Sequence, residues 1–188
     1  MIFATNNKGK LTEIKQILSE YEIYSLKEKN INIDVVEDAD SFYGNALKKA
    51  KEIYEITKEP VIADDSGICI TELNDFPGVQ THRFLGEDKT DEDRNLALIE
   101  KANETKTRKA KVVCNLVYYD GKKTIVGEGI LEGKITTSPR GENGFGFDPI
   151  FELVNGKTLA ELTSEEKNNQ SARYLATIDL KEKLLAIN

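Results

Sequence analysis

Hydrophobic and polar positions predict that this chain opens as a strand, a polar turn and a helix. A short apolar run at residues 2–4 is typical of a buried strand, and it gives way at once to the polar residues 5–10. Leu11, Ile14 and Leu18 then recur at the spacing of one helix face. The first helix is therefore expected to follow the polar turn directly.

The same patterns predict further elements. Helices are expected where apolar residues recur every three or four positions behind a capping residue, and strands where short apolar runs end in turn residues. The expected strands are 22–26, 31–36, 60–63, 67–71, 109–119, 123–137 and 149–153. The expected helices are 41–57, capped by Asp40 or Ser41, and two helices that open with capping boxes at Thr90 and Thr163 and run to about residues 103 and 186.

Alternating strands and helices, followed by two long strands joined at Asp120-Gly121, predict an α/β fold. We expect a mixed, twisted sheet with helices on both faces. At 188 residues the chain fits one domain, 1–188, which is large enough to bury roughly 70% of its unfolded surface.

The charge balance limits the classes of partner. The formal net charge is −7, and because a nucleic-acid backbone usually binds a basic surface, we expect no nucleic-acid partner. No apolar run approaches the ~20 residues of a membrane span, and the chain begins with strand residues rather than a leader. Cys69 and Cys114 lie in separate apolar strand patterns, which indicates buried thiols. We therefore expect a cytoplasmic protein.

The polar turn 5–10 is the first candidate binding site. Backbone N–H groups and the positive end of the helix dipole converge there, which suits a phosphate chain. An ordinary solvated helix N-terminus is the alternative, because the turn lacks the GxxxxGK[ST] pattern of a P-loop. The turn consists of Thr5, Asn6, Asn7, Lys8, Gly9 and Lys10.

A pair of carboxylates, Asp64 and Asp65, forms the second candidate site. The sequence Asp64-Asp65-Ser66-Gly67 follows a predicted buried strand, and ligands of open α/β sheets bind beyond the carboxyl ends of strands. A plain turn is the alternative. Neighbouring strand residues point to opposite faces, so at most one of the two carboxylates aims squarely into a given site.

Glu37 follows another predicted strand and is a candidate second ligand for Mg²⁺. This ion usually takes one or two carboxylates together with phosphate oxygens and water. The alternative for Glu37 is a solvated loop. Lys48, Lys49 and Lys51 form a charged helix face that is solvating unless one of them turns toward the acidic strand end.

A glycine-rich loop at 140–148 is the third candidate. Phe145 and Phe147 alternate there with glycines, which predicts either a tight turn or a platform on which a nucleobase stacks at ~1–3 kcal/mol per aromatic ring. Local reasoning gives Lys167 and Arg173 no role beyond surface charge. The only histidine, His82, has no partner that would complete a zinc site or a triad.

Five stretches in this order resemble the inosine triphosphate pyrophosphatase family, also called Ham1-like or XTP/dITP diphosphatases, over the full length. The matching residues are Ala4-Thr-Asn-Asn-Lys-Gly-Lys10, Ala63-Asp-Asp-Ser-Gly67, Pro77-Gly78 with Arg83, Gly144-Phe-Gly-Phe-Asp-Pro-Ile-Phe151, and Glu161-Leu-Thr-Ser-Glu-Glu-Lys167. Each match is weak alone, but the ordered set is specific.

The resemblance implies a homodimeric, Mg²⁺-dependent enzyme with two lobes around a central cleft. It would hydrolyse ITP, dITP and XTP to the monophosphate and pyrophosphate, which cleanses the nucleotide pool. It also implies roles for individual residues. The turn from Thr5 to Lys10 would hold the triphosphate, Lys49 would support the phosphates, and Ser66 would touch the substrate. Glu37 and Asp65 would bind Mg²⁺, and Asp65 would also be the general base. The residues that would border the nucleobase are Phe145, Gly146, Phe147 and Asp148, with Lys167, Ala172 and Arg173 closing on it.

One position departs from the family pattern. The family commonly has Ser-His-Arg where this chain has Ser171-Ala172-Arg173. Loss of one hydrogen bond costs ~0.5–1.5 kcal/mol, so we expect weaker substrate binding, with selectivity against ATP retained if Arg173 reads the 6-keto oxygen.

Two other functions stay open at this point: a pyrophosphatase of shifted base preference, and a non-catalytic nucleotide sensor. The choice of base and metal, the dimer interface, and the roles of Gln80 and His82 are not fixed by the sequence.

Overall fold

The structure, a computed structural model, describes residues 1–86 and 88–186, which divide into two compact units. Unit 1 contains residues 1–66 and 114–129 and the C-terminal stretch from residue 172, and unit 2 contains residues 67–113 and 130–171. The long strands β3 (Val61–Ile70), β5 (Lys109–Tyr119) and β6 (Thr124–Ile135) contribute residues to both units.

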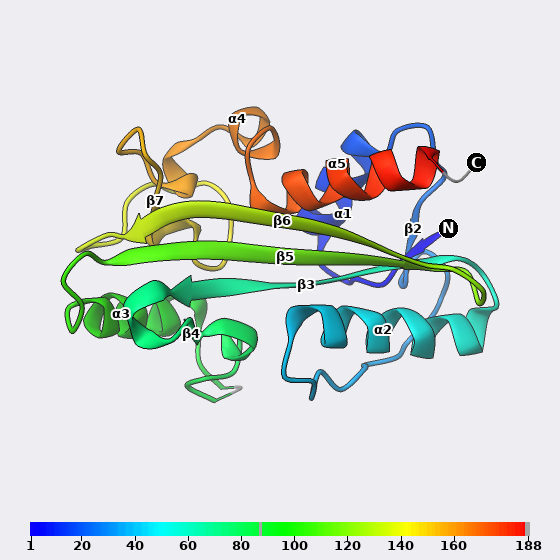
Figure 1. The fold of residues 1–188 in the computed structure, drawn as a ribbon, viewed down its shortest axis with the longest axis horizontal. Helices are drawn as coiled ribbons and strands as arrows, with labels where there is room; N and C mark the ends of the chain where they lie inside the picture. The colour runs from blue at the N-terminus through cyan, green and yellow to red at the C-terminus, as the bar shows by residue number, and fades with distance from the viewer. Residues whose placement is uncertain (87, 187–188) are drawn as a thin grey trace. The chain divides into compact units, whose positions relative to one another are not determined.

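Unit 1 is a sheet with helices on both faces. Its strand order is β2 (Tyr24–Ser25), β1 (Ile2–Phe3), β3, β5, β6, and β1 is parallel to both β2 and β3. Figure 1 shows α2 (Phe42–Thr57) on one face, with α1 (Lys8–Ile17) and α5 (Ala172–Leu185) on the other. The predicted mixed α/β fold with flanking helices is confirmed.

Small residues let the helices of unit 1 approach the sheet closely. On α2, Ala46 and Ala50 are fully buried in the core that includes β1 and β3. On β6, a Cβ atom at Gly129 would lie 2.0 Å from the carbonyl oxygen of Ala172, so the first turn of α5 touches the strand backbone. The glycine therefore fixes where α5 begins, and with it the position of Arg173.

Unit 2 carries the remaining elements. The short strands β4 (Phe76–Pro77) and β7 (Phe151–Glu152) pair antiparallel with β3 and β6, respectively. Two helices, α3 (Asp91–Ala102) and α4 (Ser164–Asn168), each begin with the predicted capping box. Across residues 1–86 and 88–186, no helix has the length and apolarity needed to cross a membrane.

Several predicted boundaries are wrong because tertiary contacts override the local pattern. The motif at residues 64–67 is not a turn: it lies inside β3, where every residue is buried. Residues 31–36 form no strand, although Ile31, Ile33 and Val35 pack on the core as their alternation suggests. Lys8, Gly9 and Lys10 belong to the first turn of α1 rather than to a preceding turn.

The C-terminal helix is also not continuous. The sequence predicts one helix from residue 163, but the chain leaves α4 at Asn169 and begins α5 at Ala172. The break lies at residues 169–171 and includes Asn169 and Ser171, which have weaker helix propensity than the residues around them. The predicted strands 22–26 and 149–153 are each shortened to two residues, which form β2 and β7, respectively. Residues 148–150, just before β7, form a 3-10 turn.

Candidate active site

The polar turn after β1 presents exposed groups at a helix N-terminus. Asn7 caps α1, since its side chain accepts a hydrogen bond from the Lys10 amide at 3.2 Å, and the Thr5 hydroxyl accepts one from the Asn7 amide at 3.1 Å. Residues 6–9 are exposed, whereas Thr5 is buried. The predicted phosphate-binding segment thus has a backbone fixed by side-chain hydrogen bonds, and its residues 6–9 are accessible to solvent.

Asp64 is the centre of a buried ion network in unit 1. Its Oδ2 atom lies 2.9 Å from Lys10 Nζ and 3.4 Å from Arg173 Nε. Burial alone would raise the pKa of Asp64, but the charges of Lys10, Arg173 and Lys49 hold that pKa well below its usual range. Arg173 also binds Glu13 at 2.7 Å, and its Nη2 lies 3.4 Å from the Ser66 hydroxyl. Asp64 is therefore an ionised carboxylate that fixes two cations.

Asp65, next along β3, has a different environment. Its carboxylate accepts hydrogen bonds from the Asn45 amide at 2.8 Å and from the Ser66 backbone N–H at 2.9 Å, and no lysine or arginine of the described residues forms an ion pair with it. Burial raises the pKa of Asp65 to about 6; the Asn45 hydrogen bond opposes this rise and the nearby charge of Glu37 adds to it. The fold thus lowers the pKa of Asp64 and raises the pKa of its neighbour Asp65.

Lys49 connects the carboxylates of unit 1. Its ammonium group donates to the backbone carbonyl of Asp64 at 3.0 Å and forms an ion pair with Glu37. Burial lowers the pKa of Lys49, but Asp64 and Glu37 outweigh that effect and raise it, so this lysine stays charged. Of the helix lysines, Lys49 therefore turns toward the acidic strand, whereas Lys48 pairs with Asp38 near solvent.

The donor set around Asp65 fits a hard divalent cation. Burial and the nearby charge of Glu37 disfavour the ionised form of Asp65, and a cation bound at these carboxylates would relieve both effects. Within residues 1–86 and 88–186 no group of three or more histidine, cysteine, aspartate or glutamate side chains is placed to hold a metal ion. Two carboxylates are within the number that Mg²⁺ usually takes from a protein, with water and phosphate oxygens as its other ligands.

In unit 2, the loop that carries Phe145 and Phe147 is held by a buried ion pair. Lys167 Nζ lies 2.6 Å from Asp148 Oδ2, and the same carboxylate oxygen accepts the Phe145 backbone N–H at 2.8 Å. The Lys167 ammonium also lies 4.2 Å from the centre of the Phe145 ring. Phe145 itself is 37% exposed. The loop therefore presents an aromatic face beside a positive charge.

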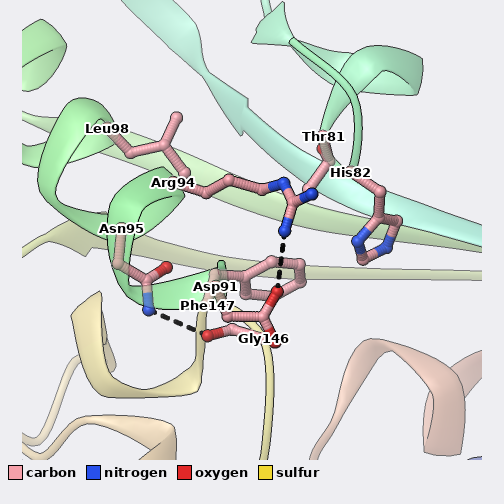
Figure 2. A pocket seen from close by; sticks show the side chains of 8 residues that line it. All are labelled: Thr81, His82, Asp91, Arg94, Asn95, Leu98, Gly146 and Phe147. Carbon is pink, nitrogen blue, oxygen red and sulfur yellow. Dashed lines mark hydrogen bonds and ion pairs between the residues drawn. The ribbon is translucent and has the colours of Figure 1, made fainter. Parts of the chain in front are cut away.

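A small cavity lies between α3 and this loop. It has a volume of about 10 Å³ and is lined by Thr81, His82, Asp91, Arg94, Asn95, Leu98, Gly146 and Phe147 (Figure 2). The exposed Gln80 accepts a hydrogen bond from Arg83 Nε at 2.8 Å, and His82 is exposed at the cavity.

Local sequence reasoning missed several members of these clusters. The surface role that it gave Lys167 and Arg173 is wrong, because both are 8% exposed and ion-paired. Glu13 and Asn45 were also missed, although each is a polar residue on the apolar face of its helix, beside Ile14 and Ala46. A buried polar residue needs a hydrogen-bonding or charged partner. A polar residue on the apolar face of a helix therefore indicates such an interaction, and the sequence alone shows this feature.

The fold and these clusters define a mixed α/β protein whose ionised carboxylates and lysines gather beyond the end of β1. The chain belongs to the Ham1 family, whose family model matches residues 1–183. It is 44% identical to a dITP/XTP pyrophosphatase of Thermoanaerobacter sp. (strain X514), with 98% of this chain and 96% of the relative covered. It is also 42% identical to a dITP/XTP pyrophosphatase of Aquifex aeolicus (strain VF5), with 92% and 90% covered.

Solved structures give the same family. The Ham1 protein of Staphylococcus aureus matches with a TM-score of 0.90 at 35% identity and covers 100% of this chain and 98% of its own. A HAM1 protein from Coxiella burnetii matches with a TM-score of 0.89 at 34% identity, with 98% of both chains covered. The resemblance predicted from the five motifs is confirmed.

Proposed function

We propose that this protein hydrolyses non-canonical purine nucleoside triphosphates, namely ITP, dITP and XTP, to the nucleoside monophosphate and pyrophosphate. The observation that carries the proposal is the cluster of Asp64, Asp65, Lys10 and Lys49 beside the N-terminus of α1. Its cations and N–H groups suit a triphosphate, and its poised carboxylate suits the activation of water. Family membership supports the same reaction.

The triphosphate is assigned to the turn Thr5, Asn6, Asn7, Lys8, Gly9 and Lys10, with Lys49 and Ser66 as further contacts. Helix N-termini bind phosphate through their unpaired N–H groups and dipole. Lys8 is exposed, so its ammonium group is accessible to an anion in solvent. Lys10 and Lys49 are already positioned by Asp64, which removes most of the cost of ordering them when substrate binds.

Asp65 is assigned as the general base. Its carboxylate takes a proton from water as the water oxygen bonds to the α-phosphorus, and the bond from that phosphorus to the bridging oxygen breaks to release pyrophosphate. A pKa of about 6 leaves the carboxylate ionised at neutral pH while keeping it more basic than an exposed aspartate. The Asn45 amide and the Ser66 N–H hold the carboxylate in place.

Glu37 and Asp65 are the proposed ligands of Mg²⁺. When bound, this ion would neutralise charge on the phosphate oxygens, which is the main requirement of phosphoryl transfer. Lys49 binds Glu37 and also donates to the backbone carbonyl of Asp64, so it holds the Glu37 carboxylate near β3.

The base is assigned to the loop of unit 2, where Phe145 stacks on it and Gly146, Phe147 and Asp148 border it. Lys167, held by Asp148, adds a donor near the ring of Phe145. Arg173 remains the proposed reader of the 6-keto oxygen through Nη2, whose bonds to Asp64 and Ser66 are both long at 3.4 Å. We also propose that the protein forms a homodimer and is located in the cytoplasm.

One assay separates this function from its alternatives. Purified protein with Mg²⁺ is given equal concentrations of ITP, XTP, ATP and GTP, and pyrophosphate is measured apart from orthophosphate. Pyrophosphate from ITP and XTP, with ATP and GTP nearly untouched, supports the proposal. Cleavage of all four nucleotides would indicate a shifted base preference, which the replacement of a histidine by Ala172 favours. No pyrophosphate from any would indicate a nucleotide sensor.

A further inference from the structure

The loop that carries Phe145 is contacted by a side chain from a helix far away in the sequence. Asn95 lies in α3, is 6% exposed, and donates from Nδ2 to the carbonyl oxygen of Gly146 at 2.9 Å across 51 positions of sequence (Figure 2). The capping box at Thr90 fixes the start of α3, so Asn95 is carried by a rigid element.

The glycines beside Phe145 do not by themselves restrict the loop to one backbone conformation. Gly144 and Gly146 flank Phe145 with φ angles of +79° and +62°, which glycine adopts as readily as negative values. No heavy atom lies within 4 Å of the position that a Cβ would take on Gly146. Hydrogen bonds to the loop backbone must therefore set the direction in which the Phe145 ring points.

Two such contacts bracket Phe145. On one side, the Asp148 carboxylate accepts the backbone N–H of Phe145 at 2.8 Å. On the other side, Asn95 donates to the carbonyl of the next residue, Gly146. The cavity between α3 and the loop has a volume of about 10 Å³, room for about one water molecule, so the loop has little space to shift toward the helix.

We propose that Asn95 is a positioning residue that holds the Phe145 ring in the orientation that stacks on the purine base. This inference rests on the proposed function and extends it, because it names a residue that sets substrate affinity without touching substrate. An amide is required at this position: a carboxylate of the same shape has no proton to donate to a carbonyl at neutral pH, and it would repel it.

The test is a double-mutant cycle with Asn95→Asp and Phe145→Ala, measured as KM and kcat for dITP. Loss of the hydrogen bond raises KM by about tenfold in the chain that keeps Phe145, because the partly buried Gly146 carbonyl loses its donor. In the Phe145→Ala background the same substitution changes KM by less than about twofold, since no ring is left to position. Equal increases in both backgrounds would overturn the proposal, because that result describes a purely structural residue.

Control variants keep the result interpretable. Asn103→Asp makes the same charge change at the other end of α3 and keeps the acceptor that Arg108 binds, so its KM is expected to match that of the unchanged chain. Asn95→Leu removes the donor without burying a charge, and it is used if Asn95→Asp does not fold. Asn95→Gln retains a donor and is expected to recover part of the lost affinity.

A measurement independent of turnover separates this inference from the proposed function. The chain contains no tryptophan, so Phe145→Trp introduces a single reporter. Asn95→Asp in that background is expected to increase quenching of the tryptophan by acrylamide, whereas Asn103→Asp leaves quenching unchanged. Unchanged quenching in the Asn95→Asp chain would overturn the positioning role, even if dITP is hydrolysed. Increased quenching without dITP hydrolysis would keep that role and reject the proposed substrate.

Discussion

The cluster of unit 1 is held by several charges on a buried strand, whereas the loop of unit 2 is held by hydrogen bonds and one buried ion pair. In unit 1, Asp64 lies on a fully buried strand and binds two cations, so its geometry is fixed by charge. In unit 2, Phe145 is partly exposed and is flanked by glycines with positive φ, so its position depends on a few hydrogen bonds. Chemistry at a phosphate needs fixed charges, whereas a base platform needs an accessible apolar face.

This difference predicts that the two regions fail in different ways. Substitutions in the unit 1 cluster should lower kcat, because they remove groups that act on the developing charge. Substitutions in the unit 2 loop should mainly raise KM, because they affect how the base is held. Four predictions test this contrast, beginning with the largest expected effect.

Replacement of Asp65 is expected to have the largest effect. Asp65→Asn removes the general base, so kcat for dITP should fall by about 10²- to 10⁴-fold, while dITP binding, measured by equilibrium dialysis, is retained. Asp34→Asn, at an exposed aspartate, is the matched control and should leave kcat unchanged. Full turnover in the Asp65→Asn chain would remove Asp65 from the mechanism.

Replacement of Asp148 should affect stability and KM together. Asp148→Asn leaves the Lys167 ammonium buried without its carboxylate, which should lower the free energy of unfolding by about 3 kcal/mol and raise KM for dITP more than it lowers kcat. Denaturant unfolding and steady-state kinetics measure the two effects. Asp75→Asn breaks a more exposed ion pair with Lys111 and should cost less than about 1 kcal/mol. A fall in kcat alone would contradict the proposed division of labour.

The raised pKa of Asp65 predicts a cost in stability. Because its folded-state pKa of about 6 lies above the ordinary aspartate pKa of 3.8, the folded protein binds the proton more tightly than the unfolded chain does. The stability that this carboxyl contributes is full below about pH 4 and is lost as pH rises through about 6. Without metal at pH 7.5, Asp65→Asn should therefore raise the free energy of unfolding by up to about 3 kcal/mol.

Urea unfolding of both chains across pH 4–8 measures this effect. The advantage of the Asp65→Asn chain should shrink as the pH falls toward about 4. Added Mg²⁺ should stabilise the unchanged chain more than the variant, because it binds the folded state through the carboxylates. A stability difference that does not vary with pH would show that Asp65 has an ordinary pKa in the fold.

The two regions also differ in how well the sequence predicted them. The order of strand, polar segment and helix at the N-terminus follows from local pattern, although residues 8–10 of the expected turn form the first turn of α1. The interior position of Asp64 in β3 does not, because a strand tolerates that carboxylate only when Lys10 and Arg173 neutralise it. Likewise the surface role expected for Arg173 failed because its partner Glu13 is 160 positions away in sequence. Local pattern predicts elements, but buried charge depends on long-range partners.

The smallest effect is expected at Ala172, where the family commonly has histidine. Ala172 is 3% exposed and opens α5 one residue before Arg173. Ala172→His would add one polar group near the proposed reader of the base, so kcat/KM for dITP relative to dATP should rise by about 2- to 12-fold, the worth of one hydrogen bond. The ratio, rather than either value alone, is measured because it cancels effects on the shared triphosphate. An unchanged ratio would leave base selection to the loop of Phe145 and Lys167, and discrimination would then belong to unit 2 rather than to the charged cluster of unit 1.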